Sequence, residues 1–231
     1  MFLFEKKDRL VDTHFFKGTV ICHSSLLRDS MGIVDSTLEL LRYLELLGVG
    51  EVICTPTVTG ESDIKVAISA FEHLQERYKG GVKLSLSFKY SLDSDIVVNL
   101  GGELKSIGDN KILLVSQFEK RPPRLHSKIY DALSVGKYDS VVLAYPERYK
   151  YVNTFSYFYR LSSYYRYKFQ LDLLSLSGYN GHRAKRNASY LLDNDMYDSI
   201  TLDVVDVDTL RSHISKIKLT QKQMDSLKDI V

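Results

Sequence analysis

The chain has 231 residues, a length typical of a single domain with one large hydrophobic core. Its 31 lysines and arginines nearly balance its 29 aspartates and glutamates, which gives a formal net charge of +2. This balance excludes the strong overall field with which basic proteins attract nucleic acid or an anionic membrane, so a charged partner would have to meet a local patch.

The chain contains two cysteines, Cys22 and Cys54, and both lie in apolar stretches. Two thiols are too few for a disulfide scaffold or a cysteine-based zinc site, so we expect buried, reduced side chains. The first seven residues include a glutamate and two lysines, and they lack the apolar run of a signal peptide or a membrane span. We therefore expect a cytoplasmic protein, and the alternative is a peripheral membrane tether through Phe2, Leu3 and Phe4.

Short apolar runs rich in β-branched residues alternate along the chain with longer stretches of helical period. The predicted strands span residues 18–22, 51–55, 82–88, 112–116, 140–144, 168–173 and 199–204. The predicted helices span residues 35–47, 63–78, 125–135, 183–192 and 209–217, and Thr220 starts a terminal helix within residues 218–231. Repeated βα units of this kind predict one α/β domain over residues 1–231, with an N-terminal extension over residues 1–17.

The apolar runs at residues 112–115 and 141–144 are continuous, as in parallel strands that are buried on both faces. This pattern only slightly favours a closed barrel over an open sheet. In either arrangement, reactive side chains are expected at the C-terminal ends of the strands.

Two motifs follow predicted strands, Ala144-Tyr-Pro-Glu-Arg-Tyr and Gln170-Leu-Asp-Leu-Leu-Ser-Leu-Ser-Gly-Tyr-Asn-Gly. With Thr55-Pro56, Pro122-Pro123 and Ala188-Ser-Tyr-Leu-Leu, they make residues 18–213 resemble the PHP (polymerase and histidinol phosphatase) superfamily, specifically the CpsB-type protein tyrosine phosphatases of capsular polysaccharide synthesis. The resemblance implies a distorted TIM-like (β/α)7 barrel, the PHP fold. It also implies a cluster of divalent manganese, iron or zinc ions that makes a hydroxide nucleophile from bound water.

Most positions where the resemblance places metal ligands carry other side chains. His23 and Asp203 are residual ligands, and Asp29 is the one acid in the stretch that matches the family's acidic loop. The degenerate ligand positions are Cys22, Ser25, Thr57, Lys89, Ser116, Tyr145 and Val205. This set is insufficient for a metal cluster, so we expect no cofactor, and a divalent metal only if the protein is active.

Lys89 is the most consequential change, because an ammonium stands where the family has a carboxylate that bridges two dications. We hypothesise that Lys89 lies among Asp203, Glu147 or Asp172 as a substitute for metal charge. Glu147 and Arg148 are retained family positions, and the resemblance makes them the candidate catalytic residues, with Arg148 holding the substrate phosphate. A structural salt bridge from Arg148 to Glu147 or another acid is the alternative.

The other acids and histidines admit simpler interpretations. A second metal set could be drawn from His23, Asp29, Asp203, Asp206 and Asp208, but alternating acids after a strand are typical of helix caps and solvated loops. His14 imitates an Asp-x-His metal motif, yet it precedes the first predicted strand. The remaining histidines are interpreted as surface residues: His73, His126, His182 and His213.

Eight tyrosines lie between residues 145 and 167, interleaved with lysines and arginines. One interpretation is an amphipathic helix that packs its rings on the barrel. The other is an exposed surface of aromatic and cationic side chains that binds a glycan or a protein.

Three functions follow as hypotheses. The first is a catalytically degenerate relative of the capsule phosphatases, a binding or regulatory module whose partner is the tyrosine-phosphorylated tail of a capsule-export autokinase. The second is an active metal-dependent phosphotyrosine phosphatase acting on that kinase. The third is a glycan- or protein-interaction module that uses residues 145–167. The resemblance also implies that the protein can form a homo-oligomer.

Overall fold

The structure, a computed structural model, describes residues 9–27, 34–92, 104–107, 111–117 and 138–227. Within these residues, nine short parallel strands form one sheet in the order β4-β6-β7-β8-β9-β10-β2-β3-β5. Their bounds are β2 Val20–His23, β3 Glu51–Cys54, β4 Thr57–Val58, β5 Lys83–Leu86, β6 Lys89–Ser91, β7 Ile112–Ser116, β8 Ser140–Ala144, β9 Tyr167–Asp172 and β10 Ser199–Thr201.

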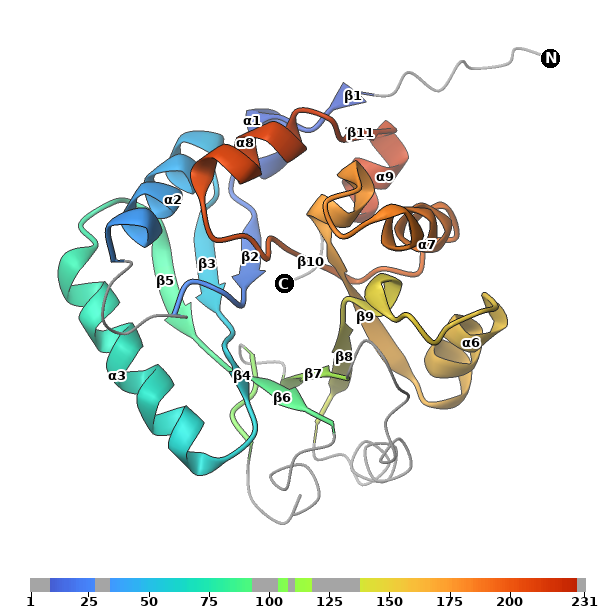
Figure 1. Cartoon of the computed structure of the whole chain (residues 1–231), viewed down its shortest axis with the longest axis horizontal. Helices are drawn as coiled ribbons and strands as arrows, with labels where there is room; N and C mark the ends of the chain where they lie inside the picture. Colours follow the sequence, from blue (N-terminus) through green and yellow to red (C-terminus); the bar gives the residue numbers. More distant parts are fainter. Residues whose placement is uncertain (1–8, 28–33, 93–103, 108–110, 118–137, 228–231) are drawn as a thin grey trace.

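The sheet closes into a barrel because β4 continues β3 and β6 continues β5 along the chain (Figure 1). β5 pairs with β3, and β6 pairs with β4. The break between β3 and β4 contains Pro56, which has no N–H to donate to a neighbouring strand. Hydrogen bonds still cross this break, since Ser87 N donates to Cys54 O at 2.9 Å and Lys89 N donates to Pro56 O at 3.0 Å. The predicted distorted TIM-like (β/α)7 barrel is therefore confirmed, with two of its strands bent.

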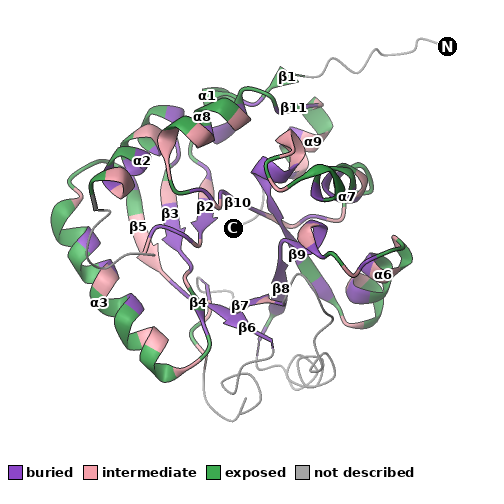
Figure 2. Cartoon of the chain, viewed as in Figure 1, coloured by how far each residue is buried: buried purple, intermediate pink, exposed green. Residues whose placement is uncertain are grey.

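The strand alternation divides the core into two layers. Along β7, Leu114 faces an inner cluster with Cys22, Ile53 and Val142, whereas the residues on either side of Leu114 join the outer core under the helices. Figure 2 shows most strands of the barrel buried, β5 partly exposed, and the helices exposed on their outward faces. Both cysteines are buried and free, as expected.

The helices lie around the outside of the barrel (Figure 1). The longer ones are α2 Val34–Leu47, α3 Glu61–Arg77, α7 His182–Asp193 and α8 Val207–Ile214, each close to its predicted range. The predicted helix at 125–135 lies outside the described residues, as do Pro122 and Pro123. No helix of the described residues is long and apolar enough to cross a membrane.

Both ends of the described chain are tied to the barrel. β1, Arg9–Leu10, pairs antiparallel with β11, Lys218–Leu219, and α1, Thr13–Phe16, buries Phe15 and Phe16 completely. Residues 9–17 are thus part of the packed structure rather than an extension of it. The predicted terminal helix begins after β11, at α9 Gln221–Ser226, and Thr220 starts it as the sequence predicted. The structure adds a capping box between Thr220 and Gln223.

Candidate functional site at the barrel mouth

Lys89 lies at the centre of the C-terminal end of the barrel, which we call the barrel mouth. The side chain is 4% exposed. Its Nζ donates to Tyr145 Oη at 2.6 Å and to Ser24 Oγ at 2.9 Å. Burial lowers the pKa of Lys89 to about 8, partly opposed by the negative charge of Asp203. The ammonium is thus held inside the protein by hydroxyl groups, with the acids nearby rather than in contact.

Tyr145 completes this group from the end of β8. Its hydroxyl lies 2.5 Å from Ser24 Oγ, and the Arg148 guanidinium lies 4.9 Å from the centre of its ring. Its backbone is left-handed, with φ 52° and ψ 48°, a conformation that costs a non-glycine residue on the order of 1 kcal/mol. Pro146 then starts the short helix η1, Pro146–Arg148, which brings Arg148 back over the barrel mouth.

Arg148 holds the acidic side of the barrel mouth. Its Nη1 lies 3.3 Å from Asp203 Oδ2 and 3.6 Å from Asp172 Oδ2. Burial alone would raise the pKa of Asp203, but the positive charge of Lys89 and a hydrogen bond from Ser25 hold that pKa below its usual value. Asp172 is fully buried, and burial raises its pKa to about 6. Arg148 therefore pairs with Asp203 and Asp172 rather than with Glu147.

Glu147 points away from the barrel mouth into the core. It is 0% exposed, and its Oε1 accepts hydrogen bonds from Asp172 N and Ser175 Oγ, each at 3.0 Å. Its Oε2 accepts from Tyr197 Oη at 3.0 Å. Burial, reinforced by the charge of Asp172, raises the pKa of Glu147 to about 8. These contacts place Glu147 as a buried link between η1 and the turn after β9, so it does not lie beside Lys89 as hypothesised.

His23, predicted as a residual ligand, is buried within electrostatic reach of Asp203 and Lys89. Cys22 belongs to the inner cluster, and the strand alternation puts Ser24 on the same side as Cys22. His23 Nδ1 accepts from Ser25 N at 3.3 Å, and burial lowers the pKa of His23 to about 4. The buried Nε2 has no hydrogen-bond partner among the described residues. Sequence reasoning missed Ser24, although its spacing of two from Cys22 was the available signal.

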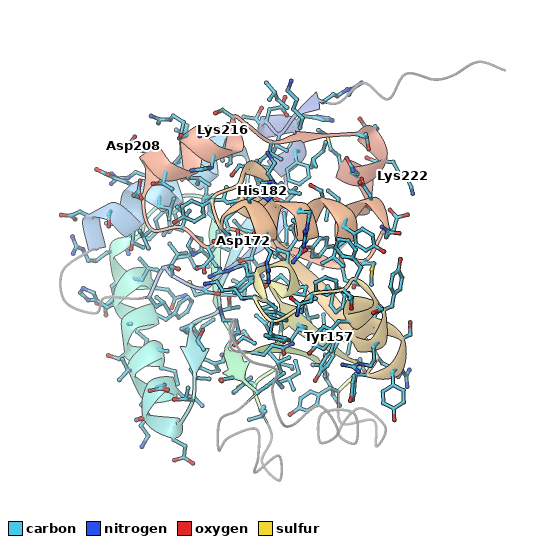
Figure 3. All side chains as sticks on the ribbon, turned by 45° about the vertical axis from the view of Figure 1, so that its right-hand side comes forward. Tyr157, Asp172, His182, Asp208, Lys216 and Lys222 are labelled. Atoms are coloured by element: carbon cyan, nitrogen blue, oxygen red, sulfur yellow. The ribbon has the colours of Figure 1, made fainter. Side chains whose placement is uncertain are left out.

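The other degenerate ligand positions are dispersed. Thr57 and Val205 are exposed, and Ser116 pairs with the backbone of β6. Asp206, from the second predicted metal set, caps α8 by accepting from Thr209 N at 2.7 Å. In Figure 3, Asp172 lies among the inner side chains, whereas Asp208 lies at the edge of the molecule. The helix-cap interpretation is confirmed for Asp206, and Asp29 lies outside the described residues.

These side chains do not fit a cluster of divalent cations. Within the described ranges, no three histidines, cysteines, aspartates or glutamates converge as ligands. The two acids of the barrel mouth, Asp172 and Asp203, face the Arg148 guanidinium. The position between them and Ser24 is filled by the Lys89 ammonium, whose charge opposes that of a metal ion.

The described histidines outside the site are exposed, as interpreted, except His213. His73 and His182 are exposed, and so is His14, whose backbone N–H donates to the Asp12 cap of α1 at 2.9 Å. His213 is half-buried, with Nδ1 2.8 Å from Ser177 Oγ. His126 lies outside the described residues.

The tyrosine-rich segment packs most of its rings on the barrel, but not from one amphipathic helix. It runs through η1, α6 Ser156–Tyr159, the π-turn η2 Arg160–Tyr164 and into β9. Tyr149 and Tyr167 are buried, whereas Tyr159 is 43% and Tyr164 is 69% exposed. The barrel thus covers most of the rings, and the exposed rings among the described residues gather at α6 and η2.

Comparison with known proteins agrees with this architecture. The family profile "Capsular polysaccharide synthesis, CpsB/CapC" matches residues 22–227. A crystal structure from work on YwqE of Bacillus subtilis and CpsB of Streptococcus pneumoniae, described as unique metal-dependent tyrosine phosphatases, superposes with a TM-score of 0.70 at 21% identity, covering 82% of this chain and 81% of that one. No curated protein sequence matches the chain.

Two more distant structures share the fold. The phosphotriesterase from Mycobacterium tuberculosis has a TM-score of 0.52 at 10% identity, covering 96% of each chain. A mutant organophosphorus hydrolase from Deinococcus radiodurans has a TM-score of 0.50 at 11% identity, covering 94% of this chain and 92% of that one. At these identities the likenesses show the fold alone.

Proposed function

Because the chain belongs to the CpsB/CapC family of capsular polysaccharide synthesis proteins, we propose that it is a member whose metal-dependent phosphatase reaction has been lost or weakened, and that it acts as a binding or regulatory module. The observation that carries this proposal is the buried Lys89 ammonium between Ser24 and Tyr145. A dication entering the same space would meet a fixed positive charge and too few anionic ligands.

The partner that fits this proposal is the tyrosine-phosphorylated tail of a capsule-export autokinase, met in the cytoplasm. Arg148 supports this choice, because its side chain is 22% exposed at the barrel mouth and a guanidinium can form two parallel hydrogen bonds to a phosphate. Asp203 and Asp172 orient that guanidinium in the absence of a ligand. Binding a phosphotyrosine without hydrolysing it needs this cation but no metal-bound hydroxide.

The decisive experiment measures metal and turnover on the same preparation. Purified full-length protein is expected to carry far less than one manganese, iron or zinc ion per chain by elemental analysis. It is also expected to leave an aryl phosphate unhydrolysed when Mn²⁺ is added, because the ligands that would make a hydroxide nucleophile are missing. Two or more ions per chain together with chelator-sensitive hydrolysis would overturn the proposal and establish an active phosphatase.

Binding is tested separately with a fluorescent tyrosine peptide in phosphorylated and unphosphorylated forms. The phosphorylated form should bind more tightly, and Arg148→Met should remove most of that preference, a loss of about 10-fold or more for a charge-assisted contact. Arg42→Met is the matched control, since Arg42 is an exposed arginine on α2. Equal binding of both peptides by the unmodified protein would contradict the phosphotyrosine role.

A further inference from the structure

Ser24, Lys89 and Tyr145 form a compact group of reactive side chains that the proposed binding role does not use. The three terminal atoms lie within 2.5 to 2.9 Å of one another. Lys89 and Tyr145 are buried, whereas Ser24 is half-buried and so retains contact with solvent. A serine hydroxyl that an incoming molecule can reach thus lies beside an amine that water does not surround.

The backbone around Ser24 is held on both sides. His23 O accepts from Thr55 N at 2.9 Å, and Ser25 N donates back to His23 Nδ1 at 3.3 Å. The Ser25 hydroxyl also donates to Asp203. These bonds fix the turn that follows β2 and aim Ser24 at Lys89, which is the kind of pre-organisation that a nucleophile needs.

The strained backbone of Tyr145 is a second, independent observation. A left-handed conformation at a buried tyrosine persists only where the surrounding structure enforces it, and such residues gather at functional sites. Here the conformation directs the Tyr145 hydroxyl to Ser24 and Lys89 together.

We propose that these three side chains form a metal-independent acyl-transfer site for carboxylic esters, with Ser24 as the nucleophile, Lys89 as its general base and Tyr145 as a hydroxyl that relays the proton. Serine paired with lysine is a known variant of the serine nucleophile with its base. An ester carbonyl is neutral, so its attack needs no dication, whereas phosphate monoester hydrolysis in this kind of fold does.

The reaction balances with water as the only co-reactant. Ser24 Oγ bonds to the ester carbonyl carbon while its proton passes to the neutral Lys89 amine. The resulting ammonium, directly or through Tyr145, protonates the departing alkoxide as the carbon–oxygen bond breaks, which leaves an acyl-serine and a free alcohol. Water then attacks the acyl carbon, gives a proton to Lys89, and the ammonium returns that proton to Ser24 Oγ as a carboxylic acid forms.

The neutral amine becomes available near neutral pH because of its surroundings. Lys89 is buried with Tyr145 and Cys22 beside it, and this desolvation lowers its pKa. The positive charge of Arg148 lowers the pKa further, whereas the negative charges of Asp203 and Asp172 raise it. The base form is therefore expected to grow as pH rises through about 8, well below the usual range for lysine.

The test uses p-nitrophenyl acetate with the full-length protein and locates the acetyl group by peptide mass mapping. We expect release of p-nitrophenol, a rate that rises through pH 8, and acetylation of Ser24. Ser24→Ala and Lys89→Met should each lower the rate by about 100-fold, which is typical for loss of a nucleophile's general base or of the nucleophile itself. Tyr145→Phe keeps the ring and should lower the rate less.

The matched controls are Ser62→Ala and Lys65→Met, which replace an exposed serine and an exposed lysine on α3, outside the barrel. Both should leave the rate unchanged, and circular dichroism should show that all variants fold. Acetylation of exposed residues only, or a rate that survives Ser24→Ala, would overturn the acyl-transfer site. Metal content and phosphopeptide binding are measured independently, so failure here does not decide the proposed function.

Discussion

At the residue scale, Glu147 shows how a retained motif position can serve the fold rather than the chemistry. The carboxylate is enclosed by the Asp172 N–H, Ser175 and Tyr197, and it does not touch the barrel mouth. Arg148, its neighbour in sequence, points in the opposite direction and donates a hydrogen bond to Asp203. The sequence identified both residues as candidates. Only the structure shows that Glu147 is a buried acid of the core, whereas Arg148 lies at the barrel mouth where it can contact an anion.

Replacing Glu147 by Gln should flatten the pH dependence of stability. The folded protein raises the pKa of Glu147 from 4.5 to about 8, so the folded state binds more protons than the unfolded chain in that interval. The contribution of Glu147 to the free energy of unfolding should therefore fall as pH rises from about 4.5 to about 8, with a slope of up to about 1.4 kcal/mol per pH unit. Urea unfolding across this window measures the slope.

Glu147→Gln should lose this contribution. The slope that remains combines Asp172, whose pKa is also raised, with His23, whose lowered pKa makes the free energy of unfolding rise between about pH 4 and 6.5. Glu72→Gln, at an exposed position of α3, is the control and should keep the slope of the unmodified protein. If Glu147→Gln retained the full slope, the pKa of Glu147 in the folded protein would be close to its value in the unfolded chain.

At the element scale, local signals located most helices and strands, and they failed where one strand serves two neighbours. The predicted strand 82–88 contains β5, which pairs with β3, whereas β6 begins just beyond the predicted end and pairs with β4 and β7. The predicted strand 199–204 ends at Thr201, because the chain turns there to bring Asp203 over the barrel mouth. Such breaks depend on the neighbouring strands, so composition alone does not reveal them.

The cap of α9 offers an element-scale prediction. Thr220 Oγ1 accepts from Gln223 N at 3.2 Å, and Gln223 Oε1 accepts from Thr220 N at 2.8 Å. Thr220→Ala removes one of these bonds and should lower the free energy of unfolding by about 1 kcal/mol. Chemical denaturation measures the change, and Ser212→Ala, an exposed position within α8, should change it by less than about 0.5 kcal/mol. Equal effects of the two substitutions would show that the cap contributes nothing particular.

At the scale of the whole molecule, the closed barrel is held together by segments from both ends of the chain. β1 pairs with β11, and Phe15 and Phe16 pack edge to face with ring centres 5.0 Å apart. α1 also lies against α2, so Phe15 and Phe16 belong to the main hydrophobic core. Loss of this packing should weaken the fold although it lies far from Lys89 in sequence.

Phe16→Ala should therefore lower the free energy of unfolding by about 3–5 kcal/mol, because it leaves a cavity at a fully buried site. Denaturant titration of the two proteins checks this value. Tyr164→Ala is the control, since it removes an aromatic ring that is 69% exposed. A cost below about 1 kcal/mol for Phe16→Ala would contradict the packing of Phe16 in the core.

The sequence by itself determined the order of strands and helices, the α/β class and the family resemblance, because periodicity and motifs are local properties of the chain. Through the family resemblance it also predicted that Lys89 replaces an acid. Only the tertiary structure decided that Lys89 meets Ser24 and Tyr145, that the His23 ring is buried, and that Glu147 is buried. These outcomes depend on barrel closure, which brings together residues dozens of positions apart and removes water from around their charges.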